Sequence, residues 1–350
     1  MLDALKRSNF VIKTVNSSYG HFMYDNEKYF FKIVDKNDFI KEINGYLEVC
    51  DKLKVKKLVN ILTDNEKYYL IYEYEKTIIK NKGLIHDLFV YYEYYNISYD
   101  KNIFINLINN FRRRYRNLKI LSYSKNDEFF EGSIKNKLLK WYINDLNFDK
   151  AVEINYKEST TTNNIINETI KYFNNLENKL CLISSGNPNT LNLSTNSMNF
   201  DLKTAGYNNI YGEVAITYIS YLIFDAYFSP KYNKNSYLNH NLIYKYIKKF
   251  KPKLKYKNTN KIIINSNIVT SSIRKKYIKD YLLMLKEENV PINKEIKYYL
   301  IMRLLCVFNI NKINLIDYYY ILYLIHFIYN YIQEDAINSL IDFLDCMEEI

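Results

Sequence analysis

The sequence predicts an α+β chain, with a small β-rich lobe at the N-terminus and a larger, mostly helical lobe after it. Residues 1 to about 76 alternate short strand-like runs with one helical pattern. From about residue 77 helical periodicity dominates, interrupted by a strand, a turn and a second strand over 180–202, with an expected loop over 184–206. We therefore expect two lobes, 1–76 and 77–350, and a helical subdomain at the C-terminal end of the second.

A strand followed by a helix is the clearest pattern of the first lobe. Residues 29–34 read as a strand, whose period of two places Phe30, Lys32 and Val34 on one face. Residues 38–53 then carry apolar side chains at helical spacing. Lys32 is thus expected to lie on the face of the sheet that borders a cleft, opposite the face of Tyr29, Phe31 and Ile33.

The most informative segment of the second lobe joins an apolar strand at 180–184 to a turn at 185–188 with the sequence SGNP. Glycine, asparagine and proline are common turn formers. Asn192 and then a solitary Asp201 follow the turn. Amide and carboxylate oxygens are hard ligands that suit Mg²⁺ beside a triphosphate. We therefore expect Asn192 and Asp201 to hold a magnesium ion.

This segment resembles the aminoglycoside phosphotransferase and choline kinase branch of the protein-kinase-like superfamily. There the catalytic loop usually reads His-Gly-Asp, with a metal-binding Asn five residues after the Asp and an Asp-Phe-Glu-x-Ala-Gly stretch beyond it. Here the corresponding residues are SGN at 185–187, Asn192, and DLKTAG at 201–206. The resemblance is strongest over 180–215 and looser over about 10–230. It implies a bilobal, protein-kinase-like fold.

One departure from the family pattern concerns catalysis. The Asp that accepts the proton of the substrate hydroxyl falls on Asn187, and the preceding His falls on Ser185. An amide can accept a hydrogen bond but takes up no proton near neutral pH. A positioned general base contributes roughly 10²–10⁴-fold, so nucleotide binding and catalysis have to be considered separately.

The resemblance also implies residues that bind ATP. Lys32 would hold the α- and β-phosphates, and Glu42 would orient it, with Glu48 as the competing choice on the same predicted helix. Glu73 lies in the run 68–75, which resembles the last strand of the small lobe and the hinge that binds adenine.

A phosphate-covering loop and a brace for the catalytic loop complete the implied site. Ser18 and Gly20 belong to the run SSYG at 17–20, where the family's phosphate-covering loop is expected. No G-x-G-x-x-G and no G-x-x-x-x-G-K-[ST] occurs in the chain. In relatives an acidic residue at the start of the next helix braces the catalytic loop, which makes Glu213 the candidate brace.

Taken together, the resemblance implies phosphoryl transfer that depends on ATP and Mg²⁺, with a hydroxyl of a small molecule as acceptor. The alternative is a pseudokinase that binds nucleotide, or a protein partner, and uses the bilobal shape as a scaffold. Some relatives hold cationic sugars in acidic pockets, and the C-terminal end of this chain is acidic. A solvated helix face explains that tail equally well; its residues are Glu334, Asp335, Asp342, Asp345, Glu348 and Glu349.

Binding to nucleic acid is a further alternative that the charge suggests. The formal net charge is +11, and a basic run with interleaved aromatic residues lies at 111–119. Arg112 and Arg116 share one helical stripe, which favours the end of a solvated helix over a nucleic-acid interface. We therefore do not expect a nucleic-acid partner.

The remaining composition indicates a chain of the cytoplasm without a membrane span. The four cysteines are scattered and form no C-x-x-C, so neither a zinc site nor a disulfide framework is expected. The start of the chain lacks the apolar core of a signal peptide. The apolar run at 318–332 is shorter than the roughly 20 residues of a spanning helix and reads as a buried one.

Overall fold

The computed structural model describes residues 1–8, 11–13, 18–75, 83–95, 101–142, 145–234 and 251–349. The chain is α+β, with an antiparallel sheet near the N-terminus and mostly helices after it. It separates into two compact units. The first comprises Met1–Phe111, Ile183–Gly206 and Ile223–Lys249, and the second comprises Arg112–Leu182, Tyr207–Leu222 and Phe250–Ile350. The predicted lobe boundary at residue 76 falls outside the described residues and stays a prediction.

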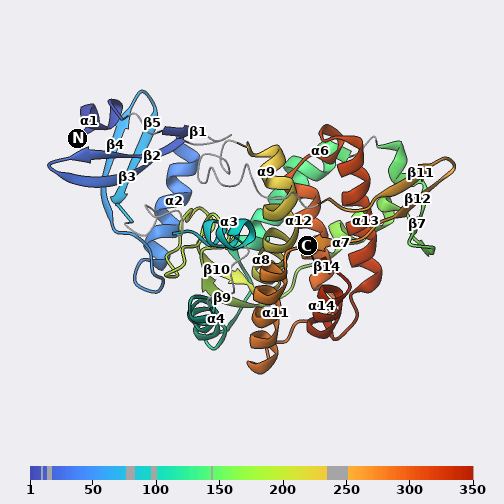
Figure 1. Cartoon of the computed structure of the whole chain (residues 1–350). Coiled ribbons are helices and arrows are strands. Elements are labelled where there is room, and N and C mark those ends of the chain that lie inside the picture. Colours follow the sequence, from blue (N-terminus) through green and yellow to red (C-terminus); the bar gives the residue numbers. More distant parts are fainter. Residues whose placement is uncertain are drawn as a thin grey trace. The chain divides into compact units, whose positions relative to one another are not determined.

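A five-stranded antiparallel sheet, in the order β1-β2-β3-β5-β4, forms the N-terminal part of the first unit (Figure 1). Its strands are β1 (Val11–Lys13), β2 (Ser18–Tyr24), β3 (Glu27–Val34), β4 (Leu58–Asp64) and β5 (Lys67–Glu73). Two-residue turns close the β2–β3 and β4–β5 hairpins, with positive φ angles at Asp25 and Asn26 and at Asn65 and Glu66. Such primed turns match the twist of antiparallel strands.

The two faces of this sheet carry different partners because side chains alternate along β3. Phe31 points to the face covered by α1 (Leu2–Lys6) and packs in a cluster with Leu5 and Phe22. Val34 packs on the other face with side chains of α2 (Lys36–Val49). The predicted helix is therefore confirmed, but it begins at Lys36 rather than 38 and ends at Val49 rather than 53. Asp35 caps it by accepting a hydrogen bond from the Asp38 amide at 2.8 Å.

The rest of the first unit includes α3 (Ile85–Tyr95), most of α4 (Lys101–Tyr115), the segment 183–206, the C-terminal part of η4 (Ser220–Phe228) and α9 (Ser229–Tyr232). The predicted strand at 180–184 is confirmed as β9 (Lys179–Ser184). The second strand expected before 202 does not form. Instead Leu193 and Asn199 form an isolated antiparallel bridge, so that 192–200 doubles back on itself, and the next strand is β10 (Gly206–Asn209).

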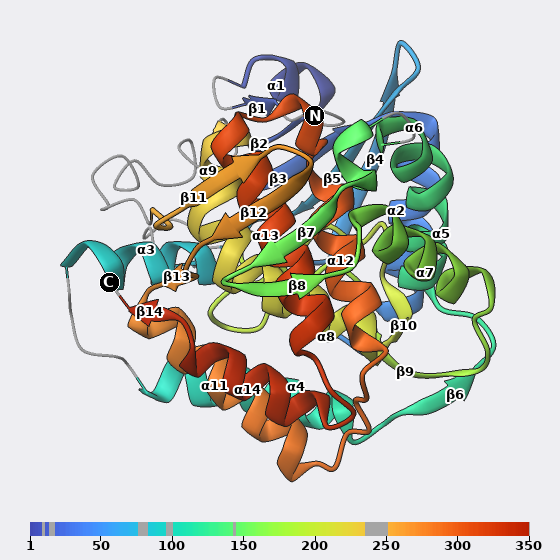
Figure 2. The same cartoon turned by 90° about the vertical axis from the view of Figure 1, so that its right-hand side faces the viewer.

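The second unit contains two further sheets of three or more strands and most of the helices. The three-stranded sheet has the order β10-β9-β6, and the four-stranded sheet has the order β11-β12-β7-β8. Figure 2 shows the four-stranded sheet lying over α13, which contacts β7 and β12. The strands of these sheets and the short parallel pair are β6 (Lys119–Leu121), β7 (Ala151–Ile154), β8 (Lys157–Ser159), β10 (Gly206–Asn209), β11 (Lys255–Asn258), β12 (Lys261–Asn265), β13 (Val269–Thr270) and β14 (Glu348–Glu349).

Buried helices form the centre of the second unit. The helix predicted at 318–332 is confirmed as α13 (Leu315–Tyr331), which follows α12 (Ile296–Val307), and both helices are buried over most of their length. No helix in the described part of the chain is long and apolar enough to cross a membrane. The remaining helices are α5 (Lys125–Ser133), η2 (Ile134–Leu138), α6 (Leu139–Tyr142), η3 (Leu146–Asp149), α7 (Thr162–Asn174), α8 (Ile210–Ile219), α11 (Ser272–Glu287), η6 (Ile310–Lys312) and α14 (Ala336–Asp345).

Most of the charges that suggested other functions are paired within the second unit. Arg116 donates from Nε and Nη2 to the two carboxylate oxygens of Glu288, each at 2.7 Å, and Arg112 Nε also contacts that carboxylate at 3.3 Å. Among the acidic residues of the tail, four contact lysines: Glu334 with Lys294, Asp345 with Lys279, Glu348 with Lys253, and Glu349 with Lys275. These pairs favour solvated helix and strand surfaces over a nucleic-acid interface or a cation-binding pocket.

Candidate nucleotide-binding site

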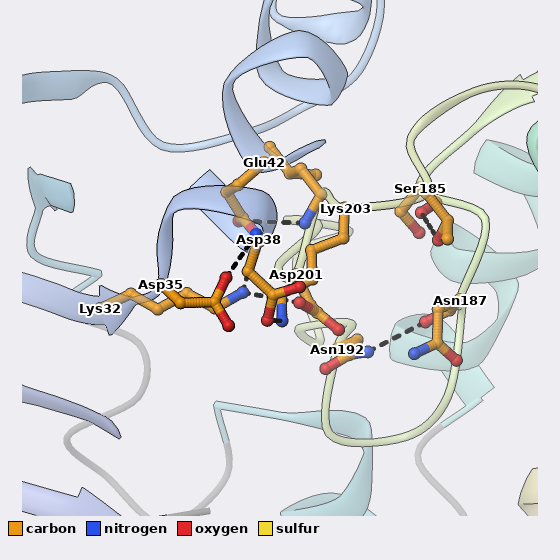
Figure 3. Close-up of polar contacts among 11 residues, drawn as sticks. Lys32, Asp35, Asp38, Glu42, Ser185, Asn187, Asn192, Asp201 and Lys203 are labelled. Carbon is orange, nitrogen blue, oxygen red and sulfur yellow. Dashed lines mark hydrogen bonds and ion pairs between the residues drawn. The ribbon is translucent and has the colours of Figure 1, made fainter. Parts of the chain in front are cut away.

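The centre of the candidate site is a lysine held by two carboxylates, all within the first unit. Lys32 Nζ lies 2.7 Å from Glu42 Oε2 and 2.6 Å from Asp201 Oδ1 (Figure 3). The side chains of Lys32 and Glu42 are 11% and 3% exposed, whereas that of Asp201 is 35% exposed. Of the two predicted partners on α2, Glu42 contacts Lys32, while the carboxylate of Glu48 lies against Gly206.

The charges of this triad stabilise one another. Burial disfavours the charged form of Lys32, but the carboxylates of Asp201 and Glu42 outweigh it and raise the pKa of Lys32. Burial likewise opposes ionisation of Asp201, but Lys32 and then Lys203 lower the pKa of Asp201 below its ordinary value. Lys32 and Asp201 therefore both stay charged at neutral pH.

A glycine in α2 allows the backbone beyond Asp201 to approach the helix. Glu42 uses its second oxygen, Oε1, to accept a hydrogen bond from the Leu202 amide at 3.1 Å. A Cβ atom at Gly45 would lie only 1.8 Å from the carbonyl oxygen of Leu202. Glycine inside a helix is less favourable than alanine by about 1 kcal/mol, so this close approach explains its presence. Gly45 thus helps to fix Asp201 next to Lys32.

The backbone around Asp201 adopts a turn that few residue types accept. Asp201 itself has a φ angle of 57°, in the left-handed region, which aspartate and asparagine tolerate better than most other residues. Thr204 Oγ1 donates to the carbonyl of Ser185 at 3.2 Å, and a Cβ atom at Gly186 would lie 2.2 Å from the Thr204 carbonyl oxygen. The 201–206 stretch therefore packs directly against the predicted catalytic turn.

The loop at 187–192 orients the second predicted metal ligand. Asn192 Nδ2 donates to the backbone carbonyl of Asn187 at 3.1 Å, so its Oδ1 points away from that carbonyl. Asn189 Oδ1 accepts hydrogen bonds from the amides of Leu191 and Asn192, which closes a tight Asx turn. The Phe200 amide donates to the Asn192 carbonyl at 2.9 Å and brings the residue next to Asp201 alongside Asn192.

The donor set suits Mg²⁺ bound to a nucleotide. Asn192 Oδ1 and the Asp201 carboxylate are oxygen ligands, and a magnesium ion on a nucleotide takes its remaining ligands from phosphates and water. In the described residues no group of three or more His, Cys, Asp and Glu side chains is placed to hold a metal. Asn192 and Asp201 stay the predicted ligands of a metal that would take its other ligands from a nucleotide and water.

The predicted catalytic position, Asn187, offers hydrogen bonds but no group that takes up a proton near neutral pH. Asn187 Oδ1 accepts from Asn189 Nδ2 at 3.3 Å, and the Asn187 amide helps to lower the pKa of Asp201. The hydroxyl of Ser185 is buried and has no hydrogen-bond partner among the described residues. The hydroxyl of Ser185 therefore supports neither Asn187 nor Asp201 through a hydrogen bond.

The structure shows a loop brace that the sequence did not reveal. Asp225 is buried in η4 and accepts hydrogen bonds from Thr190, at 3.2 Å from its amide and 2.5 Å from its hydroxyl. On the other side of the loop, the His86 amide donates to the Thr190 carbonyl at 3.0 Å. A single aspartate in an otherwise apolar helical run was the available signal. The predicted brace, Glu213, belongs to the second unit and stays a prediction.

The segment predicted to bind adenine, 68–75, lies at the end of a described stretch of the chain. Glu73 is the last residue of β5, and its amide donates to the Lys57 carbonyl at 3.0 Å. Glu75 is buried and pairs with Lys56 at 2.8 Å, which fixes the chain just past the strand. The next residues, 76–82, lie outside the described part of the chain. A role of Glu73 in binding adenine remains a prediction.

The predicted phosphate-covering loop at 17–20 is wrong for the residues that the structure describes. Ser18 and Gly20 lie in β2 and pair with Ile33 and Phe31 of β3. Serine and glycine suggested a turn, but pairing with two neighbouring strands overrides that local preference. Residues 14–17 lie outside the described part, and binding of nucleotide by Ser18 or Gly20 remains a prediction.

Solved structures of other proteins resemble this chain at low sequence identity. The chain is similar in structure to aminoglycoside phosphotransferases. A thermostable mutant of APH(4)-Ia in its apo form has a TM-score of 0.47 and 8% sequence identity, over 97% of this chain and 94% of that one. A further mutant of that protein, in a ternary complex with ADP and hygromycin B, has a TM-score of 0.44, 8% identity and the same coverage.

An aminoglycoside-3'-phosphotransferase of type VIII has a TM-score of 0.39 and 10% identity, over 70% of this chain and 90% of that one. No protein-family model and no curated protein matches the sequence. Similarity at this level carries no activity or substrate over to this chain. Function has to be inferred from the residues of its own site.

Proposed function

We propose that the chain binds ATP with Mg²⁺ at this site and slowly transfers the γ-phosphoryl group to a hydroxyl of a small molecule. The observation that carries the proposal is the position of Lys32 between Glu42 and Asp201. A lysine on a strand, a glutamate on the following helix and an aspartate after the catalytic turn are the parts that a kinase-type site requires.

Each of these residues has a definite task in the proposed site. Bound Mg²⁺ would neutralise the charge that the triphosphate carries. Lys32 donates from its ammonium group to phosphate oxygens, and Glu42 holds that group in place through the 2.7 Å contact. Asn192 and Asp201 offer the oxygen ligands for the metal. Glu42 also fixes the Leu202 amide, so that one side chain positions both Lys32 and the backbone beyond Asp201.

Asn187 can orient the acceptor but cannot take its proton. Its amide would hold a hydroxyl by hydrogen bonding. The transition state of phosphoryl transfer is loose in most analyses, so early removal of the proton contributes little to bond breaking. The proton must then leave to solvent or to phosphate, and we expect transfer to be slow rather than absent.

The substitution Asn187→Asp tests this proposal. It restores a carboxylate at the position of the general base, and ADP formation should rise by up to roughly 10²–10⁴-fold. The assay follows ADP formed from ATP with Mg²⁺, in water and with a panel of amino alcohols and amino sugars as acceptors.

Asn187→Ala is the matched control and should not accelerate the reaction. An unchanged or lower rate in Asn187→Asp, with ATP binding intact, would show that Asn187 does not stand at a base position.

A second candidate function is a pseudokinase that binds nucleotide without transferring phosphate. The observation that favours it is the pair of replacements at the turn, Asn187 for the base and Ser185 for the histidine. It predicts that ATP binds to the wild type and to Asn187→Asp while neither forms ADP. The same assay, combined with a binding measurement, separates the two functions.

A further inference from the structure

We propose that Lys203 is a second phosphate-binding cation of this site, and that it lets the nucleotide bind with less dependence on Mg²⁺ than in an ordinary kinase-type site. The inference rests on the proposed nucleotide site and concerns which positive charges of that site compensate the negative charges of the triphosphate. Lys203 follows the predicted metal ligand Asp201 by two residues.

The backbone on both sides of Lys203 is fixed by hydrogen bonds. Glu42 Oε1 accepts from the Leu202 amide at 3.1 Å on one side, and Thr204 Oγ1 donates to the Ser185 carbonyl at 3.2 Å on the other. The Lys203 side chain is only 21% exposed. It therefore differs from a mobile surface lysine, because its base is held beside Asp201 and its length lies partly buried.

The ammonium group of Lys203 has one carboxylate partner that phosphate could replace. It forms an ion pair with Asp38, in the first turn of α2, whose side chain is 20% exposed (Figure 3). Partly exposed ion pairs of this kind contribute little to stability. Asp38 also keeps a favourable environment without the lysine, because acidic side chains are stabilised near a helix N-terminus. Lys203 can therefore move from Asp38 to a phosphate at small cost.

Lys203 carries its charge close to the predicted metal ligand. It follows Asp201 by two residues, and Lys32 already contacts the Asp201 carboxylate at 2.6 Å. A divalent metal approaching Asp201 would meet two fixed positive charges, whereas a phosphate oxygen would be attracted by both. The family that the chain resembles has Glu at the position of Lys203. The local charge here is therefore more positive by two units than in that family, which favours binding of an anionic phosphate.

The test measures ATP affinity twice for each variant, once with EDTA and once with Mg²⁺ at matched ionic strength. Wild type should bind ATP in EDTA, and Lys203→Met should weaken that binding roughly tenfold or more, the usual effect of losing a charged hydrogen bond. Binding of ATP with Mg²⁺ should change much less. Lys203→Arg keeps the charge and should retain metal-free binding, and Asp38→Asn should strengthen it by releasing the lysine.

Lys52→Met is the matched control, because Lys52 follows α2, is 45% exposed and bonds to the carbonyl of Glu48 away from Asp201. It should leave both affinities unchanged. Equal metal dependence in wild type and Lys203→Met, with tight binding of ATP and Mg²⁺ in both, would overturn the role of Lys203 and leave the nucleotide site standing. No binding of ATP to wild type under either condition would overturn the nucleotide site itself.

Discussion

At the scale of single residues, the charged side chains of the site form ion pairs, whereas some buried hydroxyls beside them form no hydrogen bond among the described residues. Lys32, Glu42 and Asp201 satisfy one another. Tyr72 is different: it lies on the same face of the sheet as Lys32, is only 7% exposed, and its hydroxyl has no hydrogen-bond partner among the described residues. Burial, followed by the charge of Glu42, raises the pKa of Tyr72.

We expect Tyr72→Phe to leave the stability of the free protein unchanged or to raise it by about 1 kcal/mol. A buried donor without a partner costs about that much, and phenylalanine keeps the ring contacts with Phe30 and Tyr46. Urea unfolding with and without ATP measures both effects. A loss of stability above 1 kcal/mol in the free protein would mean that the hydroxyl is bonded, and a loss only with ATP would make it a ligand contact.

The central residues could be predicted from the sequence because each has a local signature. Lys32 follows from the period of two in its strand, and Asn192 and Asp201 follow from their spacing after the turn. The contacts of Lys203 with Asp38 and of Asp225 with Thr190 could not be predicted, because they join residues far apart in the chain. Neither pair belongs to a short sequence motif that would have indicated the contact.

At the scale of elements, α2 and the 201–206 stretch act as one support. The helix supplies Glu42 to Lys32 and to the Leu202 amide, and Gly45 lets the two backbones meet. Stability and nucleotide binding should therefore change together when this contact is disturbed.

Gly45→Ala tests that support. The alanine favours a helix by about 1 kcal/mol, but its Cβ would overlap the Leu202 carbonyl oxygen, so we expect a net loss of about 1–3 kcal/mol and weaker binding of ATP with Mg²⁺. Urea unfolding and a binding titration give the two numbers.

The chain offers a matched control in α5. A Cβ at Gly132 would meet no atom within 4 Å, so Gly132→Ala should be neutral or stabilising by up to about 1 kcal/mol and should leave ATP affinity unchanged. If Gly45→Ala behaves like Gly132→Ala, α2 and the 201–206 stretch are not packed as described.

Strands and helices with a clear hydrophobic periodicity could be predicted, whereas strands that form only through pairing with distant strands could not. The strand at 29–34 and the helix after it follow from alternation and helical spacing. The start of β2 at Ser18 was missed because SSYG has the composition of a turn, while its strand character comes from pairing with β1 and β3. The second strand expected after the predicted catalytic turn is replaced by isolated bridges, in which Asn199 pairs with Leu193 and Val55, and Ser194 pairs with Leu84.

At the scale of the whole molecule, a buried histidine in the second unit makes stability depend on pH. His326 is fully buried, with Nδ1 2.8 Å from Ser159 Oγ and Nε2 2.9 Å from Thr162 Oγ1. Burial lowers the pKa of His326 to about 3. In the unfolded chain the His326 imidazole has a pKa near 6.5, so it binds a proton below that pH, whereas in the folded chain it stays neutral down to about pH 3. The contribution of His326 to the free energy of unfolding is therefore fully present above about pH 6.5 and decreases as the pH falls below it.

This histidine alone should reduce the free energy of unfolding by about 2 kcal/mol between pH 7 and pH 5. His326→Gln keeps hydrogen-bonding groups and cannot titrate, so its profile should be flatter by that amount even if it is less stable at pH 7. Urea titrations at several pH values provide the comparison. Parallel profiles for wild type and His326→Gln would show that the imidazole is not held neutral.

The measurement that tests the central claim most directly is thermal unfolding with ATP and Mg²⁺, on wild type and on Asp201→Asn. Asparagine keeps the shape and tolerates the φ angle of 57° at this position, so the variant removes only the charge. A ligand that binds the folded state alone, at a hundredfold excess over its Kd, stabilises by about 2.7 kcal/mol.

We predict a clear upward shift in the Tm of wild type and the loss of its Mg²⁺-dependent part in Asp201→Asn. No shift in wild type, or the same Mg²⁺-dependent shift in both proteins, would contradict a nucleotide site formed by Lys32, Glu42, Asn192 and Asp201.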